Sequence, residues 1–198
     1  MIVLTFAHKG EALEFIRRKH VLPVDFYFKG LYRDGDELLV ITGPGAKQAA
    51  ANLSQICSYF GSRIQGILNL GIAGSLNPEL QLNQIYGIRH ILHEFETDQY
   101  TCTSRRADRI CITAEHPVGD DRYAAKLRAR GADCVDTEAW GLAIACHAQN
   151  LHFQAYKLIS DRAGVSTNSR EIIKQAPVYS KHLFDFYKKL DYSFLVKR

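Results

Sequence analysis

Short apolar runs alternate with segments of helical periodicity along most of the chain. The first run, residues 2–6, is rich in β-branched residues and does not alternate with polar ones, which is typical of a strand buried on both faces. Over the first seventy residues the pattern predicts strands at 2–6, 38–42 and 66–71, separated by helices within 12–19 and 43–62. Gly61 is a plausible stop for the second helix.

The second half of the chain continues this alternation. Strands are predicted at 84–95, 110–113 and 153–160, and helices at 120–131, 137–150 and 176–190. The stretch 98–109 has no clear period and is interpreted as a loop. The order predicts an α/β fold of three layers, in which helices cover both faces of a mixed, mostly parallel central sheet. No repeat or linker divides the chain, so residues 1–198 are interpreted as a single domain.

Composition and charge exclude several classes of protein. With 46% apolar and 23% charged residues, the chain resembles an ordinary globular protein rather than a disordered one. The net charge of +4 is small and the basic residues are scattered, so no nucleic-acid partner is expected. The stripe of Arg122, Lys126 and Arg130 is interpreted as the solvated face of a helix.

The N-terminus and the cysteines indicate a cytoplasmic protein. No basic region precedes the short apolar run at the N-terminus and no apolar stretch approaches a membrane span, so neither a secretion signal nor membrane association is expected. The five cysteines include no CxxC pair and lie within apolar segments, which is typical of reduced thiols.

Glycines and carboxylates concentrate where the predicted strands end. In sheets of this class the ligand lies at the carboxyl ends of the strands. Five segments meet that condition: the residues just after position 6, "TGPGAK" (42–47), "NLGIAGS" (69–75), "VDTE" (135–138) and "SDRAG" (160–164). We therefore expect the functional site at this edge of the sheet.

These segments, taken in order, resemble the purine nucleoside phosphorylase and methylthioadenosine/S-adenosylhomocysteine nucleosidase superfamily. The stretch "GPGAK" is similar to that family's Gly-x-Gly-Lys turn, and "NLGIAGSL" to its Asn-x-Gly-x-Ala-Gly-Gly stretch. In addition, "VDTEAWGLA" is similar to its Val-Asp/Glu-Met-Glu helix start, and "LISDRAG" to its Ile-Ser-Asp strand end. The resemblance covers the chain from the first strand to "SDRAG" and implies an N-ribosyl hydrolase or a pentosyltransferase.

The resemblance assigns roles to three carboxylates. Asp161 would be the general acid that protonates the purine at N7, Glu138 would hold the ribose hydroxyls, and Glu11 would activate water. Breaking an N-glycosidic bond needs such groups, because the leaving base must be neutralised and the cationic sugar stabilised. The alternatives without a catalytic role are a turn-forming aspartate at 161, a glutamate that complements the helix dipole at 138, and an exposed helix glutamate at 11.

Further residues follow from the same resemblance. It implies substrate binding by Ala73, Gly74, Ser75, Thr137, Ser160 and His116, with no cofactor. Asp136, directly ahead of a helix, is interpreted as an N-cap. His90 and His93 point to opposite faces if they lie on a strand, so no metal site is expected. The resemblance also implies a homo-oligomer, a dimer, that acts on a small nucleoside.

Departures from the family pattern favour one function and leave two alternatives open. No arginine precedes "NLG", where the phosphorylases bind phosphate, which favours water as the acceptor and therefore a nucleosidase. A phosphorylase that recruits Lys47 or Arg89 remains an alternative. Thr137 replaces a methionine of the family, and Ile72 also differs, so a binder without catalysis is a second alternative. The segment 95–110 is shorter than in the family, and His116 lies where a purine-stacking phenylalanine is expected.

Overall fold

Four parallel strands form the centre of the sheet and confirm the predicted α/β class. The computed structural model describes residues 1–19, 21–104, 107–164 and 167–191. Strand β1 (Ile2–Phe6) is buried along its whole length and lies between β4 (Glu37–Ile41) and β5 (Gly66–Ser75). The other side of β5 pairs with β10 (His152–Arg162), also in parallel. The apolar runs of the sequence are therefore the interior strands, as expected for strands covered on both faces.

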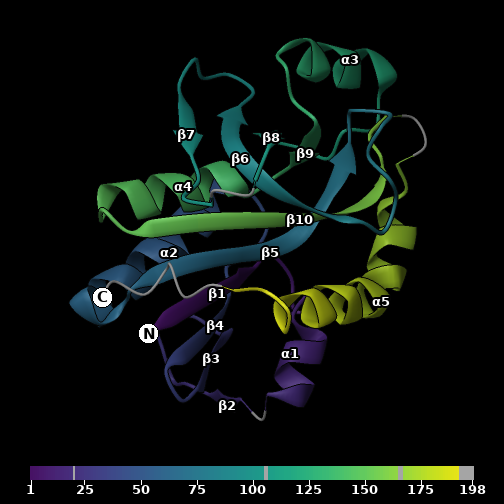
Figure 1. Cartoon of the computed structure of the whole chain (residues 1–198). Helices are drawn as coiled ribbons and strands as arrows, with labels where there is room; N and C mark the ends of the chain where they lie inside the picture. The colour runs from purple at the N-terminus through teal and green to yellow at the C-terminus, as the bar shows by residue number, and fades with distance from the viewer. Residues whose placement is uncertain (20, 105–106, 165–166, 192–198) are drawn as a thin grey trace.

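Five strands of the sheet close on themselves. Strand β10 pairs with β6 (Ile85–His93), β6 with β8 (Arg109–Thr113), β8 with β9 (Cys134–Asp136), and β9 with β5. Because β5 also pairs with β10, these strands form a closed ring, while β1 and β4 extend the sheet outwards (Figure 1). Closure removes the sheet edge on this side.

The elements that the sequence pattern did not predict are short strands. The edge strands β2 (Leu22–Pro23) and β3 (Leu31–Asp34) have no apolar run long enough to reveal them. The loop predicted over 98–109 is wrong in part, because β7 (Gln99–Thr101) pairs with β6 in this segment. Its residues are largely exposed, so hydrophobic periodicity carries no signal there.

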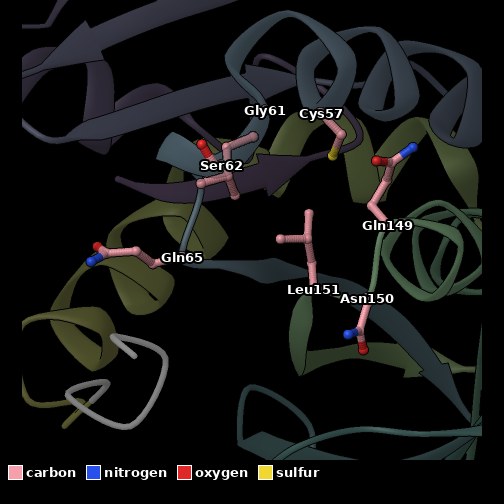
Figure 2. A pocket seen from close by; sticks show the side chains of 8 residues that line it. Cys57, Gly61, Ser62, Gln65, Gln149, Asn150 and Leu151 are labelled. Carbon is pink, nitrogen blue, oxygen red and sulfur yellow. The ribbon is translucent and has the colours of Figure 1, made fainter. Parts of the chain in front are cut away.

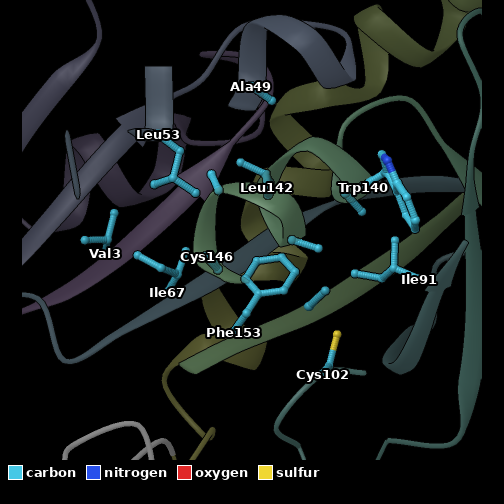
Figure 3. Packing of buried hydrophobic residues seen from close by; sticks show 14 of the residues in the cluster. Val3, Ala49, Leu53, Ile67, Ile91, Cys102, Trp140, Leu142, Cys146 and Phe153 are labelled. Atoms are coloured by element: carbon cyan, nitrogen blue, oxygen red, sulfur yellow. The ribbon is translucent and has the colours of Figure 1, made fainter. Parts of the chain in front are cut away.

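Helices cover both faces of the sheet, as the sequence predicts (Figure 1). On one face α2 (Ala46–Phe60) packs against α4 (Ala139–Ala148), and the short η1 (Gly61–Arg63) follows α2. The other face carries α1 (Leu13–Arg18) and α5 (Ser169–Tyr187), and α3 (Asp121–Ala129) lies beside β8 and β9. Figure 3 shows side chains of α2 and α4 interleaved with strand residues in the larger of the two main cores.

Capping residues define where the helices begin and end. Gly61 has a φ of 53°, and Gly131 ends the α3 region with a φ of 84°, so both predicted stops adopt the left-handed backbone that glycine favours. The Asp120 side chain accepts a hydrogen bond from the Tyr123 N–H and caps α3. Helix α5 begins at Ser169 rather than near 176, because Asn168 caps it there. Within the described ranges, no helix has both the length and the apolar character required to cross a membrane.

Candidate active site

A cavity of about 430 Å³ opens at the carboxyl ends of the central strands. Its volume falls within the usual range for small-molecule sites. The segments that follow β1, β8 and β9 contribute to its wall, together with the ends of β5 and β10 and the first turns of α5. Its lining includes every predicted site residue except Ser75: Glu11, Ala73, Gly74, His116, Thr137, Glu138, Ser160 and Asp161. The three predicted carboxylates therefore share one cavity.

A second, larger cavity of about 550 Å³ lies at the opposite, amino end of β5 and β10. Figure 2 shows the side chains of Gln65, Gln149, Asn150 and Cys57 around it. Its described lining contains no carboxylate, lysine, arginine or histidine. Volume alone is thus a poor guide here, since the acidic groups needed for glycosidic chemistry gather in the smaller cavity.

Glu11 lies in the turn before α1 and is only 3% exposed. Its Oε2 accepts hydrogen bonds from the backbone N–H groups of Ala7 at 2.9 Å and His8 at 3.1 Å. Its Oε1 accepts from the Ile72 N–H at 3.2 Å. The interpretation of Glu11 as an exposed helix glutamate is therefore wrong. The carboxylate joins the end of β1 to the end of β5. Among the described residues only the Ile72 N–H donates to Oε1, which leaves this oxygen one further acceptor site.

Asp161 follows an irregularity in β10. The register against β5 shifts between Ile159, which pairs with Ala73, and Asp161, which pairs with Gly74, so Ser160 is the extra residue. Bulges of this kind redirect the neighbouring side chain. The Ser160 hydroxyl donates to Asp161 Oδ1 at 2.7 Å, and the Thr167 hydroxyl donates to Oδ2 at 2.7 Å. Thr167 was not predicted, because it reaches Asp161 through the turn after β10, in which its N–H donates to the Gly164 carbonyl.

Glu138 occupies the N-cap position of α4 and is 7% exposed. Its side chain does not cap the helix; instead Oε1 accepts from the Gly45 N–H at 2.9 Å and from the Thr137 hydroxyl at 2.5 Å. Burial raises the pKa of Glu138, and the nearby Asp136 carboxylate raises it further. Lys157 and the two hydrogen bonds oppose that shift.

Asp136 performs the capping that the sequence predicts for it, although it is the last residue of β9. Its Oδ2 accepts from the Ala139 N–H at 2.9 Å, and its Oδ1 accepts from the Thr113 hydroxyl at 2.7 Å. The Thr113 oxygen in turn accepts from the Trp140 N–H at 2.9 Å. These bonds satisfy two N–H groups of the first turn of α4 and fix the helix that presents Glu138.

Lys157 is a further functional candidate that the sequence did not predict. It lies in the middle of β10, is 2% exposed, and places Nζ 2.7 Å from Asp136 Oδ2. Burial alone would lower the pKa of Lys157, but the neighbouring Asp136 and Glu138 outweigh burial and raise it. A lysine inside the apolar run "FQAYKLIS" was the available signal, because lysine is almost never fully buried without a partner.

Two differences from the expected site concern its rim. Ser75 does not line the cavity, because its hydroxyl donates to the Asn77 carbonyl at 2.6 Å. His8, which was not predicted, lines the mouth and is exposed, as is His116. Apolar side chains from the first turns of α5, Ile172 and Ile173, complete this part of the wall.

Neither a metal nor a reactive thiol is indicated in the part of the chain that the structure describes. No group of three or more His, Cys, Asp or Glu residues is arranged to hold a metal ion within it. All five cysteines are free and buried. Burial raises the pKa of Cys57 to about 11 and that of Cys102 to about 12, so these thiols stay protonated at neutral pH.

Comparison with known proteins identifies the fold. No family profile and no curated protein sequence matches this chain. Solved protein structures, in contrast, match this chain. A 5'-methylthioadenosine/S-adenosylhomocysteine nucleosidase from Neisseria meningitidis, in complex with methylthio-immucillin-A, matches with a TM-score of 0.81 and 18% identity, over 96% of this chain and 99% of that chain.

Two further structures give the same result. The corresponding Campylobacter jejuni nucleosidase matches with a TM-score of 0.79 and 17% identity, over 96% of this chain and 99% of that chain. A futalosine hydrolase mutant of Helicobacter pylori matches with a TM-score of 0.80 and 14% identity, again over 96% and 99% of the two chains. The chain therefore has the nucleoside phosphorylase/nucleosidase fold.

Proposed function

We propose that the protein is a nucleosidase that hydrolyses the N-glycosidic bond of a purine nucleoside, such as methylthioadenosine, S-adenosylhomocysteine or another 5'-modified adenosine. One observation carries the proposal: Asp161, Glu138 and Glu11 line a single cavity at the carboxyl ends of the strands. Leaving-group protonation, sugar binding and water activation each need one such group. The shared fold with nucleosidases supports the same reading.

Asp161 has surroundings suited to a group that gains and loses a proton. The Ser160 hydroxyl lies 2.7 Å from Asp161 Oδ1 and 3.3 Å from the Ala73 carbonyl. The Thr167 hydroxyl lies 2.7 Å from Oδ2 and 3.3 Å from the Arg162 carbonyl. Both hydroxyls can donate to the ionised carboxylate, and each has a carbonyl to turn to when the carboxyl is protonated. In the reaction Asp161 gives its proton to N7 as the bond from C1' to N9 breaks.

Glu11 and Glu138 would serve the sugar. Glu138 accepts hydrogen bonds from the ribose hydroxyls, and its charge stabilises the oxocarbenium-like sugar. Glu11 removes a proton from water while the water oxygen bonds to C1'. A Cβ on residue 71 would lie 3.5 Å from Glu11 Oε1 and 3.4 Å from Lys157 Nζ, so Gly71 leaves open the space that both atoms approach. Lys157 thus places a positive charge close to Glu11, the proposed general base.

Water is favoured over phosphate by the charge of the cavity. Its described lining contains four carboxylates, Glu11, Asp136, Glu138 and Asp161, and neither lysine nor arginine. A phosphate dianion would enter this cavity against carboxylate repulsion, without the basic side chain that phosphate sites use. The described lining therefore supports a nucleosidase over the phosphorylase alternative.

Base release in the presence and absence of phosphate tests the proposal. Purified protein is incubated with methylthioadenosine, adenosine or inosine, and free base and ribose 1-phosphate are quantified. We expect free base without phosphate, and a decrease of about 100-fold or more for Asp161→Asn with an unchanged melting temperature. Release that strictly requires phosphate would identify a phosphorylase. Stabilisation by purine nucleosides without any release would identify a binder that lacks catalysis.

We propose further that the whole chain works as one domain, in the cytoplasm, as a homodimer. Strands from both ends of the chain share one sheet, which supports a single domain. The free, buried cysteines suit a reducing compartment. Exposed Leu22, Tyr27 and Tyr59 offer apolar surface for a second copy. Light scattering after size-exclusion chromatography measures the oligomeric state, and a monomeric mass at working concentration would contradict the dimer.

A further inference from the structure

The hydroxyl of Thr137 and the carboxylate of Glu138 act on each other directly. Thr137 Oγ1 lies 2.5 Å from Glu138 Oε1, and the Gly45 N–H donates to the same oxygen at 2.9 Å. One donor lies between β4 and α2 and the other between β9 and α4, and both bind the same carboxylate oxygen. Because a carboxylate is planar, fixing Oε1 also restricts the direction of Oε2.

The other oxygen of Glu138 is available to a ligand. Among the described residues, none donates a hydrogen bond to Oε2. Because Oε2 is nevertheless not one of the buried atoms without a partner, it is accessible from the cavity. Glu138 and Thr137 both line the cavity, and Thr137 is partly exposed there. Oε2 therefore remains as an acceptor for groups that enter the cavity.

Thr137 is restricted in what it can offer a ligand. A threonine hydroxyl has one proton and two lone pairs. Its proton is used in the bond to Glu138, so toward the cavity the oxygen can only accept. Thr137 Oγ1 and Glu138 Oε2 therefore form a pair of neighbouring acceptors, whereas the methionine that the family resemblance implies at 137 would have no hydroxyl.

We propose that Thr137 is a ribose-binding and positioning residue: its hydroxyl fixes Glu138 and, together with Oε2, accepts hydrogen bonds from the two neighbouring hydroxyls of the sugar. The inference rests on the proposed function and specifies the sugar. A vicinal diol supplies two donors side by side, which matches two acceptors. A 2'-deoxy or 3'-deoxy sugar supplies only one.

The charges around Glu138 determine how the pair responds to pH. Burial and Asp136 favour the protonated form of Glu138, whereas Lys157, Thr137 and Gly45 favour the ionised form. Across the cavity the titratable side chains are Glu11, His8, His116 and Asp161, and Lys47 in the first turn of α2 is exposed. Removing the Thr137 hydroxyl removes one group that favours the carboxylate, so ionisation then requires a higher pH.

Calorimetric binding and steady-state kinetics with matched variants test the inference. Kinetics use adenosine, 2'-deoxyadenosine and 3'-deoxyadenosine, and calorimetry uses the corresponding C-nucleosides, whose glycosidic bond is not cleaved. The variants are Thr137→Val, Thr137→Ala and Thr137→Ser. Thr103→Val, which removes a hydroxyl bonded to the Phe153 carbonyl outside the cavity, is the control. We expect Thr137→Val to weaken binding of the ribose C-nucleoside, and to lower kcat/KM for adenosine, by about 10-fold to 100-fold each. The loss should be smaller for the deoxy analogue that lacks the contacted hydroxyl.

The remaining readouts separate positioning from a structural effect. Thr137→Ser should retain binding within about threefold, and Thr137→Val should move the acid limb of kcat/KM to higher pH. Unchanged diol selectivity and an unchanged acid limb in a folded Thr137→Val or Thr137→Ala protein would overturn the inference while leaving the nucleosidase intact. Absence of base release from the wild-type protein would overturn the proposed function, and selectivity for the diol in binding would still decide the role of Thr137.

Discussion

Lys157 Nζ lies 2.7 Å from Asp136 Oδ2, and both side chains are almost completely buried, at 2% and 1% exposure. The pair joins β10 to β9, the strands whose ends carry Asp161 and Glu138. A buried ion pair contributes little net stability, but removing one partner leaves an uncompensated charge in a low-dielectric interior. The pair therefore connects the stability of the fold to the arrangement of the site.

Replacement of Lys157 tests this connection. We expect Lys157→Met to lower the free energy of unfolding by about 3–5 kcal/mol, measured by urea denaturation, because Asp136 then stays buried without its partner. Adding Asp136→Asn should recover part of that loss, since the amide carries no charge. Lys174→Met removes the exposed pair with Glu171 and should change stability by less than about 1 kcal/mol. Equal effects of the two lysine variants would contradict the role given to burial.

The contact between α4 and α2 gives a second prediction. A Cβ on Gly141 would overlap the backbone carbonyl of Ala46, the first residue of α2. Gly141→Ala should therefore push the helices apart and cost about 3 kcal/mol in urea denaturation. Because Gly45 precedes Ala46 and donates to Glu138, nucleoside affinity should fall as well.

Gly119→Ala is the matched control for that substitution. A Cβ on Gly119 meets no atom within 4 Å, so the change should alter stability by about 0.5 kcal/mol at most. A Gly141→Ala protein as stable as Gly119→Ala would show that the helices can separate without cost.

The fold could be predicted because its central strands carry an unambiguous pattern. Strands β1, β5 and β10 are buried on both faces, so their sequences are continuous apolar runs that periodicity detects. Strand β7 is short and largely exposed, and its sequence does not differ from that of a loop. The closed ring could not be predicted either, because pairing of β9 with β5 depends on contacts between residues about sixty positions apart in the chain.

The site was predictable where residue type and strand end coincide. Asp161 and Glu138 come within three residues of the end of an apolar run, and the rule that ligands lie at the carboxyl ends of strands brings them together. The bond from Gly45 to Glu138 joins residues 93 positions apart, and that from Thr167 to Asp161 depends on the turn after β10, so apolar periodicity predicts neither. Ser75 follows the same rule, yet its hydroxyl turns to the Asn77 carbonyl instead of the cavity.

Glu11 gives a third prediction, in which catalysis and stability separate. Glu11→Gln should lower base release by about 100-fold or more, because an amide cannot remove a proton from water. The amide NH2 cannot accept from the N–H groups of Ala7, His8 or Ile72, so at least one bond is lost, at about 1–3 kcal/mol of unfolding free energy. Binding of a purine C-nucleoside, whose glycosidic bond is not cleaved, should remain within about tenfold. Full activity in Glu11→Gln would exclude it as the base.

The raised pKa of Glu138 gives the last prediction. In the proposed complex the ribose hydroxyls would donate to the ionised carboxylate, whereas a protonated Glu138 would have lost much of its acceptor strength. Because burial raises the pKa of Glu138 above that of an ordinary glutamate, nucleoside affinity should begin to fall at a higher pH than such a group would give. Below that pKa the affinity should fall by up to about tenfold per pH unit.

Calorimetric titration with a purine C-nucleoside between neutral and acidic pH measures this dependence. Glu138→Gln should bind more weakly at neutral pH and lack the acid loss, because the amide does not titrate. Asp161→Asn retains Glu138 and should keep the acid loss, which assigns the titration to Glu138 rather than to Asp161, another carboxylate of the cavity. An acid loss that persists unchanged in Glu138→Gln would show that another group controls binding of the sugar.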